Sequence, residues 1–494
     1  MDASQNRTPL AERPWPGLDV SGARILVAGF GVSGYAVVDQ TLQRGAHVVA
    51  VDGNDSPENE ERAEILRVLG ADIRLGAGTT DRLPDGDIDV VITSPGWRPD
   101  QPLLAEAAQR GIPVWSEVEL ARRMQPEGGP AWLTVTGTNG KTTVVTMLEH
   151  ILRTAGIRAV AAGNVGLPVI EAALDPIGFE VLAVELSSFQ LHWTQNLHAE
   201  ASCILTISDD HLDWHGGADE YAAAKGRIYD QTITACLYNL HEDRTRTLLE
   251  EADVVEGCRA IGVGLGTPGP SELGIVDDLL VDRAFVPERH RQAAELTSLT
   301  DLAHLGPHGA PAHVVFNALN AAGLARAVGV EPAHIRDGLR TYSPGEHRIQ
   351  VVHRSGGITW VDDSKATNPD AARAALASAQ SIVWIAGGDT KGAPIGDLVA
   401  GAADCLRAVV LIGTDATAFT DALTEHAPSV PVVRIDPDQE ADSVMRAAVR
   451  AAREHAADDD VVLLAPAAAS IDQFRNYAER GRLFQQAVLA EAGA

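Results

Sequence analysis

Short apolar runs recur along the chain, and most of them end at glycine or polar residues just before a helical pattern begins. An apolar run of about four to eight residues that precedes a polar loop and a helix is typical of the β-α units of a parallel sheet. The pattern therefore predicts an α/β fold, with strands at residues 24–29, 47–51, 89–93, 132–135, 181–185, 201–207 and 358–361.

Two turn-rich segments, Gln125–Pro130 and Tyr342–Arg348, divide the chain into three parts. A chain of 494 residues is too long for one hydrophobic core. We therefore expect three domains, at residues 1–130, 131–342 and 343–494. Residues 1–20 are polar and contain prolines, so we expect a loose arm before the first strand.

The net charge restricts the classes of binding partner, and the cysteines indicate the cellular compartment. The net charge of −29, from 39 basic and 68 acidic residues, argues against a nucleic-acid or anionic-membrane surface. The four cysteines are scattered without metal-ligand spacing, which favours a reducing compartment. The first residues lack the apolar core of a signal peptide, and no apolar run approaches the length of a membrane span. These features predict a cytoplasmic protein without membrane insertion.

The segment Leu133–Thr143 reads L-T-V-T-G-T-N-G-K-T-T and joins a predicted strand to a predicted helix. Glycines at such a turn let backbone N–H groups approach phosphate oxygens, and the helix N-terminus adds partial positive charge. A lysine supplies a full charge, and a following hydroxyl can hold Mg²⁺. Val135 stands where the standard phosphate loop has its first glycine, so this is a variant loop. It predicts a polyphosphate-binding site at Gly137, Thr138, Asn139, Gly140, Lys141, Thr142 and Thr143.

A glycine-rich turn, Gly29–Gly34, follows the first predicted strand and has the pattern G-x-G-x-x-G. Asp52 ends the next strand, as in a Rossmann dinucleotide-binding unit. The turn alone fits NAD, another nucleotide diphosphate, or a purely structural role. A second polar loop, Ser94–Gly96, lies at the carboxyl end of a strand, where open α/β sheets place their ligands.

Acidic and basic side chains follow the strands of the second domain. Glu185 ends an apolar run near the phosphate loop, a position that fits a Mg²⁺ ligand and equally an ordinary acid at the start of a helix. His211 lies among several acids, so a zinc hydrolase site is the competing interpretation, although no second set of ligands has zinc spacing. Lys225 lies in a predicted helix, and from pattern alone it is a solvated helix lysine.

Several of these segments resemble the Mur ligase and folylpolyglutamate synthase superfamily of ATP-dependent amide-forming ligases. The resemblance rests on the phosphate loop, E-L-S-S-F-Q, D-H-L-D and D-S-K-A-T-N, and it extends from about residue 22 to the end of the chain. It implies a Rossmann-like N-terminal domain, a central P-loop-type ATPase domain and a Rossmann-like C-terminal domain. It also implies ATP and two Mg²⁺ ions as cofactors.

The resemblance replaces the NAD interpretation of the first domain with a UDP site. It implies that this domain holds the UDP moiety of a cell-wall precursor. The substrate-binding residues that it implies are Val32, Ser33, Asp52, Ser94, Pro95 and Gly96 in the first domain, with Asn164 and Ser187 in the second.

For the nucleotide and metals, the resemblance implies Thr142 and Glu185 at one Mg²⁺ and His211 at the other. Lys225, in the pattern Y-x-x-A-K-x-R-I, matches a lysine that becomes a carbamate and helps to hold the second ion. The remaining ATP contacts that it implies are Asn317, Arg348 and Asp363. Val314 replaces the first asparagine of the family's H-N-x-x-N pattern, so one contact to the nucleotide differs here.

In the third domain, D-S-K-A-T-N is similar to the branch that adds D-glutamate to UDP-N-acetylmuramoyl-L-alanine in peptidoglycan synthesis. The D-N-P-R loop of the branch that adds a diamino acid is absent from the sequence. Ala468 and Tyr477 replace the cysteine and the phenylalanine that the family usually carries. The resemblance implies that the incoming glutamate contacts Lys365, Thr367, Lys391, Ser470 and Tyr477.

The implied reaction forms an acyl phosphate on the precursor and then an amide with the amino acid, with Lys141, His211, Lys225 and Arg348 as catalytic residues. Three alternatives remain: a redox or non-catalytic dinucleotide-binding protein, a ligase that adds L-alanine, and a folylpolyglutamate synthase. The phosphate loop argues against the first, D-S-K-A-T-N against the second and the UDP-type first domain against the third. We expect a monomer.

Overall fold

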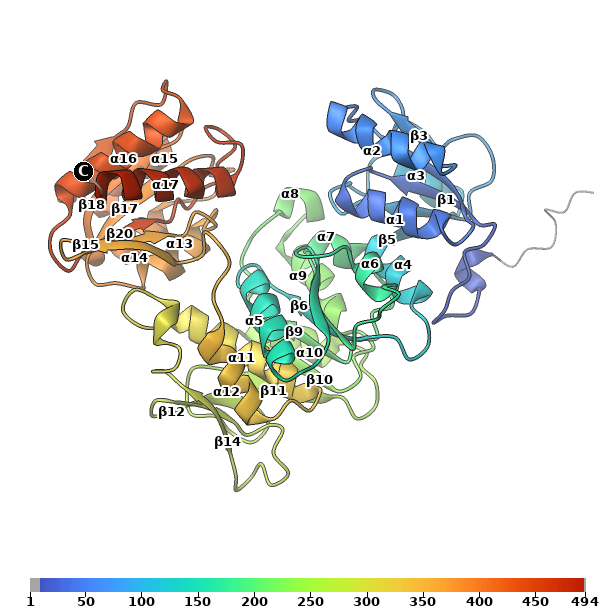
Figure 1. Ribbon diagram of the computed structural model, residues 1–494, viewed down its shortest axis with the longest axis horizontal. Helices are drawn as coiled ribbons and strands as arrows, with labels where there is room; N and C mark the ends of the chain where they lie inside the picture. Colours follow the sequence, from blue (N-terminus) through green and yellow to red (C-terminus); the bar gives the residue numbers. More distant parts are fainter. Residues whose placement is uncertain (1–8, 493–494) are drawn as a thin grey trace, which may run out of the picture. The chain divides into compact units, whose positions relative to one another are not determined.

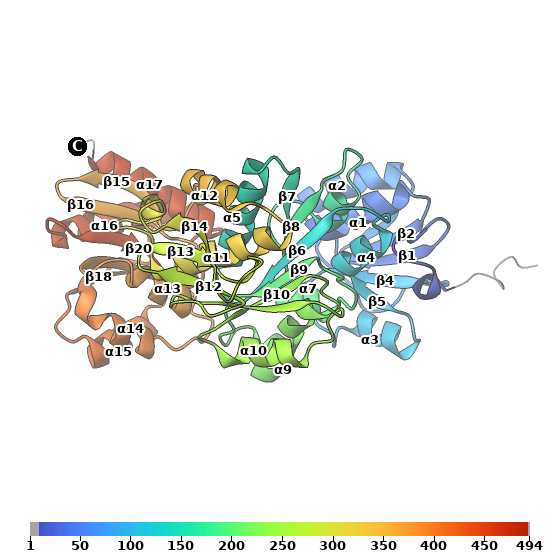
Figure 2. The ribbon, with the colours of Figure 1, turned by 90° about the horizontal axis from the view of Figure 1, so that it is seen from below.

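The computed structural model describes residues 9–492, which form two compact units (Figures 1 and 2). The first unit contains the first sheet and most of the second, and the other contains the third sheet. Parallel strand pairs dominate all three sheets, and helices connect them, so the predicted α/β class with three domains is confirmed. Within residues 9–492, no helix combines the length and apolar character needed to cross a membrane.

The first sheet is a five-stranded parallel sheet with strand order β3-β2-β1-β4-β5. The order changes direction between β1 and β4, so the loops after these two strands meet at the switch point of the sheet. Its elements are β1 (Arg24–Ala28), α1 (Val32–Leu42), β2 (His47–Asp52), α2 (Pro57–Val68), β3 (Asp72–Leu75), β4 (Val90–Thr93), α3 (Pro102–Gln109), β5 (Val114–Ser116) and α4 (Glu117–Met124).

The second sheet has nine strands in the order β14-β13-β12-β11-β10-β9-β6-β8-β7. Strand β6 lies between β9 and β8, and both pairings are parallel. The carboxyl ends of these three strands therefore share one edge of the sheet. The strands are β6 (Ala131–Thr136), β7 (Ala159–Gly163), β8 (Val181–Glu185), β9 (Ala201–Ile204), β10 (Ala235–Asn239), β11 (Arg259–Val263), β12 (Glu272–Val276), β13 (Leu279–Asp282) and β14 (Ala294–Ser298). The helices are α5 (Lys141–Thr154), α6 (Val169–Ala173), α7 (Ser188–His192), α8 (Leu212–His215), α9 (Ala218–Gly226), α10 (Asp243–Glu251), α11 (Ala312–Ala327) and α12 (Pro332–Thr341).

The third sheet has six strands in the order β15-β16-β20-β17-β18-β19, and β15 alone pairs antiparallel with its neighbour. Figure 2 shows α16 and α17 on one face of this sheet and α14 and α15 on the other. Its elements are β15 (Gln350–Ser355), β16 (Ile358–Asp362), α13 (Pro369–Leu376), β17 (Ile382–Gly387), α14 (Gly396–Ala402), β18 (Leu406–Ile412), α15 (Thr417–His426), β19 (Val432–Arg434), α16 (Ala441–His455), β20 (Val461–Leu464) and α17 (Tyr477–Ala492).

Helix α4 joins the first sheet to the second through buried polar contacts. Glu119 accepts hydrogen bonds from Arg123 at 2.6 Å and from the backbone N–H groups of Gln195 and Asn196. Glu117, at the first position of the helix, accepts one from the backbone N–H of Ile170 in α6 at 2.8 Å. Burial raises the pKa of Glu117 to about 7. One hydrophobic core cluster runs through both sheets, which explains why they form one unit.

The expected loose arm at residues 1–20 is wrong for the described part of that segment, residues 9–20. Leu10, Leu18 and Val20 are buried in the core of the first unit. The backbone of Gly17 and Leu18 donates hydrogen bonds to the carbonyls of Gln125 and Arg123. Three apolar side chains among polar residues are enough to hold such a segment on the surface of a domain. Residues 1–8 lie outside the described residues.

Candidate active site

The phosphate loop joins β6 to α5 and is shaped by its glycines. Gly140 is the N-cap of α5 and has φ +85°, a left-handed conformation that glycine adopts without strain. Gly137 packs so tightly that a Cβ atom there would lie 3.2 Å from the backbone N and O of Thr206. The loop therefore passes close beside the segment after β9 and presents the N-terminus of a 14-residue helix.

The hydroxyl and carboxylate predicted to hold Mg²⁺ lie side by side. The Thr142 hydroxyl donates a hydrogen bond of 2.7 Å to Glu185 Oε2. The Asn164 amide donates one of 2.8 Å to Glu185 Oε1. Glu185 ends β8, and β8 pairs with β6 in register up to this residue, so the sheet itself brings the carboxylate to the loop. Oxygen donors in this arrangement fit Mg²⁺.

The described residues contain no cluster of three or more His, Cys, Asp or Glu side chains with the geometry of a metal site. A zinc hydrolase centre needs three or four such ligands, so the structure offers no support for that interpretation. Mg²⁺ in nucleotide enzymes usually takes only one or two protein ligands and completes its shell with phosphates and water. The pair of Thr142 and Glu185 therefore fits a Mg²⁺ ion that arrives with a nucleotide.

The side chains of Lys141 and Lys225 both contact the phosphate loop. Lys141 Nζ donates to the carbonyls of Gly137 and Thr138, both at 2.9 Å. Lys225 Nζ donates to the same Gly137 carbonyl at 2.9 Å and lies over the Tyr221 ring, 4.7 Å from its centroid. The two side-chain nitrogens thus donate to one carbonyl oxygen, at the loop where phosphate oxygens are expected.

The interpretation of Lys225 as a solvated helix lysine is wrong, because its side chain is 2% exposed. Burial, with the nearby charge of Lys141, holds the pKa of Lys225 well below its usual range. Tyr221 lies one helical turn earlier on the same face of α9 and is also buried. Residues four apart share one face of a helix, so the burial of Tyr221 implies that Lys225 lies on a buried face as well. The charge of Lys225 suggested a solvent-exposed position instead.

Tyr221 also anchors the phosphate loop, a role that sequence reasoning missed. Its hydroxyl lies 3.1 Å from Thr138 Oγ1. Thr138 Oγ1 accepts from the backbone N–H of Ser208, and the backbone N–H of Thr138 donates to Thr206. These bonds fix the loop against the segment that leads from β9 to His211.

His211 lies next to an aromatic cluster. Its ring centroid is 4.7 Å from that of Phe189, and its Nε2 lies 3.5 Å from a carboxylate oxygen of Asp210. The residue has φ +52° and caps α8. Phe189 belongs to α7, which Ser187 begins through a capping box with Gln190. Ser187 therefore has a structural role in addition to the predicted substrate contact.

In the first domain, the glycine turn and the loop after β4 lie together at the switch point. A Cβ atom at Gly29 would collide with the side chain of Ser94, and one at Gly34 would collide with the Gly29 carbonyl. Asp52 Oδ2 accepts a hydrogen bond of 2.6 Å from the backbone N–H of Phe30. Asp52 thus holds the turn in place. Val32 and Gly96 are exposed, and Ser33, Ser94 and Pro95 are half-buried, so solvent reaches all five of these residues.

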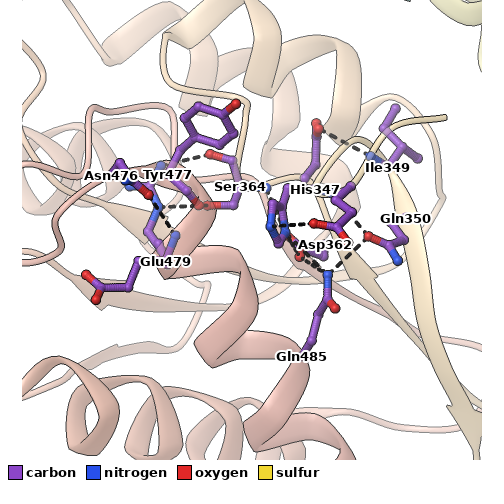
Figure 3. Close-up of polar contacts among 12 residues, drawn as sticks. His347, Ile349, Gln350, Asp362, Ser364, Asn476, Tyr477, Glu479 and Gln485 are labelled. Atoms are coloured by element: carbon purple, nitrogen blue, oxygen red, sulfur yellow. Dashed lines mark hydrogen bonds and ion pairs between the residues drawn. The ribbon is translucent and has the colours of Figure 1, made fainter. Parts of the chain in front are cut away.

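The second unit carries a separate polar network at the end of β16 (Figure 3). His347 Nδ1 lies 2.7 Å from Asp362 Oδ2, and the Gln485 amide donates to the same oxygen at 2.9 Å. The next residue, Asp363, accepts from the backbone N–H of Ile349. Burial raises the pKa of Asp363 to about 7, although the hydrogen bond from Ile349 and the charge of Arg348 oppose the shift. The network fixes the backbone on both sides of Arg348.

The three loops that follow β16, β17 and β20 in the third domain are joined by backbone hydrogen bonds. Ala467 N–H donates to the Ala366 carbonyl, and Asp389 and Ala469 exchange two bonds of 3.0 and 2.8 Å. Lys365 Nζ lies over the Tyr477 ring, 3.9 Å from its centroid. The loops that carry the predicted glutamate contacts, Lys365, Thr367, Lys391, Ser470 and Tyr477, therefore meet at one edge of the third sheet.

The structure thus brings the predicted residues together in three groups: at the switch point of the first sheet, around the phosphate loop, and at the edge of the third sheet. Asn317 lies in α11 and is buried, and Val314 is buried in the same helix. The polar residues that sequence reasoning missed are Tyr221, His347, Asp362, Arg480 and Gln485.

Three family models match successive parts of the chain. The Mur ligase MurD-like N-terminal domain matches residues 23–116, and the Mur ligase middle domain matches residues 135–325. The Mur ligase glutamate ligase domain matches residues 347–468.

Whole-length relatives agree with these matches. UDP-N-acetylmuramoylalanine–D-glutamate ligases from Streptomyces avermitilis and Streptomyces coelicolor are each 50% identical to the chain. The first match covers 94% of this chain and 98% of the relative, and the second covers 96% and 99%. Among solved structures, the UDP-N-acetylmuramate–alanine ligase MurC from Thermotoga maritima aligns with a TM-score of 0.55 at 18% identity. That alignment covers 95% of this chain and 99% of the other, and it shows similarity of fold alone.

Proposed function

We propose, since the chain belongs to the Mur ligase family, that it is an ATP-dependent ligase that adds D-glutamate to UDP-N-acetylmuramoyl-L-alanine. The reaction belongs to the synthesis of peptidoglycan precursors. The observation that carries the ATP-dependent part is the phosphate loop, in which Lys141 and Lys225 meet at one carbonyl and Thr142 meets Glu185.

The chemistry divides into two steps. The terminal carboxylate of the precursor attacks the γ-phosphorus of ATP, which gives an acyl phosphate and ADP. The amine of D-glutamate then attacks the acyl carbon, loses a proton, and expels inorganic phosphate from a tetrahedral intermediate. Little covalent chemistry is required of the protein, so positioning and charge neutralisation supply the rate enhancement.

Residues of the second domain handle the phosphates. The backbone of Thr138–Gly140 and the start of α5 cradle the phosphate oxygens, and Lys141 stabilises the charge that develops on them. Thr142 and Glu185 would hold Mg²⁺, which neutralises phosphate charge when bound. A second ion near His211 and a carbamate on Lys225 remain part of the proposal. The low pKa of Lys225 favours the neutral amine, which is the form that reacts with CO₂.

The substrate contacts are proposed domain by domain. The UDP moiety binds at the switch point of the first sheet, in contact with Val32, Ser33, Ser94, Pro95 and Gly96, whereas Asp52 acts by holding the turn. In the third domain, Arg348 and Asp363 contact ATP, and the three joined loops hold D-glutamate. The domain boundaries near residues 130 and 342, the monomeric state and the cytoplasmic location stay predictions from the sequence.

The test is phosphate release with ATP, Mg²⁺ and UDP-N-acetylmuramoyl-L-alanine, with D-glutamate, L-glutamate and meso-diaminopimelate compared. We expect release with D-glutamate alone, and its loss in Lys141→Ala. Arg153→Ala is the matched control, because Arg153 is an exposed cation at the other end of the same helix. Release with another amino acid would overturn the proposed glutamate contacts, and the absence of release with all three would overturn the ligase assignment.

A further inference from the structure

A fully buried arginine, Arg480, lies in the first turn of α17 and holds two of the three loops of the third domain. Its Nε donates to Ser364 Oγ at 3.0 Å, and its Nη2 donates to the Ser364 carbonyl at 2.9 Å. Nη1 and Nη2 donate to the Ala468 carbonyl at 3.2 and 3.3 Å. One guanidinium therefore spans the loop at residues 363–368 and the loop at residues 466–470.

Both loops carry proposed contacts to the incoming amino acid. Ser364 directly precedes Lys365, and the Ser364 hydroxyl donates to the Tyr477 carbonyl at 2.8 Å. Figure 3 shows Ser364 between Tyr477 and the network of His347 and Asp362. Ala468 lies two residues before Ser470. A shift of Arg480 would therefore move Lys365, Ser470 and Tyr477 together.

We propose that Arg480 is a positioning residue for the incoming amino acid: it fixes the loop of Lys365 relative to the loop of Ser470 without touching the substrate. The inference rests on the proposed function, since it assumes that these loops bind the amino acid. Misplacement of binding groups by about 1 Å can lower the rate of an enzyme by about a hundredfold, so the geometry of the loops matters for turnover.

The contacts require an arginine and not merely a cation. The planar guanidinium offers five N–H donors in a fixed fork, whereas a lysine offers three donors at a single atom. All the hydrogen bonds given above end on neutral carbonyl or hydroxyl oxygens. The aspartates whose charges act on the group are Asp472 and Asp362, and burial lowers the pKa of Arg480 to about 10. The group stays charged at neutral pH, which strengthens its hydrogen bonds to the two loops.

The first test compares Arg480→Lys with wild type by steady-state kinetics. We expect the KM for D-glutamate to rise by about tenfold or more, with the KM for ATP and for the UDP precursor changed by less than about twofold. Acyl-phosphate formation without amino acid, trapped by borohydride reduction, should keep its wild-type amplitude. A purely structural role would change the KM values for all three substrates alike, or it would lower the yield of folded protein. Arg482→Lys is the matched control, because Arg482 lies on the exposed face of the same helix.

Ser364→Ala provides a second variant that deletes one acceptor of Arg480, together with the hydrogen bond from Ser364 to the Tyr477 carbonyl, and keeps the core packing. We expect a smaller rise in the KM for D-glutamate, in the same direction and again without a change for ATP. Unchanged KM values for D-glutamate in both folded variants would overturn the positioning role. If wild type releases no phosphate with D-glutamate, the proposed function itself fails, and that result is distinct from a failure of the Arg480 variants alone.

Discussion

Glu117 offers a quantitative test of the contact between the first two sheets. Its carboxyl group is buried, and its pKa of about 7 exceeds the ordinary value of 4.5, which the unfolded chain should show. Between these values the folded state keeps a proton that the unfolded state has released. Stability therefore falls as the pH rises from 4.5 to 7, and the loss is complete above the folded pKa. A shift of about 2.5 units corresponds to about 3 kcal/mol.

Glu117→Gln should remove this pH dependence. A glutamine can accept the same hydrogen bond from Ile170 N–H, and it carries no charge at any pH. At pH 5 the variant and wild type should unfold at similar temperatures. At pH 8 the variant should be more stable by about 2 to 3 kcal/mol, which corresponds to a rise of about 5 °C in Tm for a unit of this size.

The assay is thermal unfolding of both proteins from pH 5 to pH 8 at one scan rate, because large proteins often unfold irreversibly. Glu250→Gln serves as the control, since the Glu250 side chain is 69% exposed. We expect the difference in Tm between this variant and wild type to be the same at every pH. A Glu117→Gln effect of the same size at every pH would refute the reasoning. It would mean that the carboxyl group is already ionised at pH 5 or stays protonated at pH 8.

Three further predictions concern the proposed ligase. Thr142→Val should raise the Mg²⁺ concentration needed for half-maximal phosphate release by about tenfold, because it deletes the hydroxyl beside Glu185; an unchanged Mg²⁺ titration would count against this metal site. Lys225→Met should lower kcat by about a hundredfold and remove the ¹³C NMR carbamate signal expected for wild type in labelled bicarbonate; a signal that persists in the variant would exclude Lys225 as its source. Tyr477→Ala should raise the KM for D-glutamate because Lys365 loses the ring beneath its ammonium group, whereas Tyr477→Phe should retain nearly wild-type values; equal KM values in both variants would contradict the role of the ring.

The fold and most of the phosphate site could be predicted from local sequence. Strand β8 has the predicted bounds, and β6 is one residue longer than predicted at each end. Each of these elements is defined by an apolar run and a glycine turn, and such signals are local. Strand β9 is shorter than predicted because its last apolar residues belong to a loop that packs against Gly137.

Two buried charged residues, Lys225 and Arg480, could not be recognised as buried from local sequence, because their burial depends on distant partners. Lys225 lies beneath the phosphate loop because β6 and α9 meet there, and Arg480 contacts Ser364 across 116 residues of chain. The spacing of residues along α17 does point to the burial of Arg480 in part, since Arg480, Phe484 and Val488 are four residues apart and share a buried face of the helix. Hydrophobicity patterns place a lysine or an arginine on the surface by default, so only the tertiary contacts reveal these positions.

The third sheet has a hydrophobic core of its own, built from strands and helices of residues 350–492. The loops proposed to hold the amino acid rest on this core, whereas the phosphate loop rests on the core of the first unit. Mutations that reshape the amino-acid loops therefore act first on the stability of the module that carries them, and the core beneath the phosphate loop keeps its packing. In evolutionary terms, such a chain can change what it adds to a growing precursor while it inherits its phosphate loop unaltered.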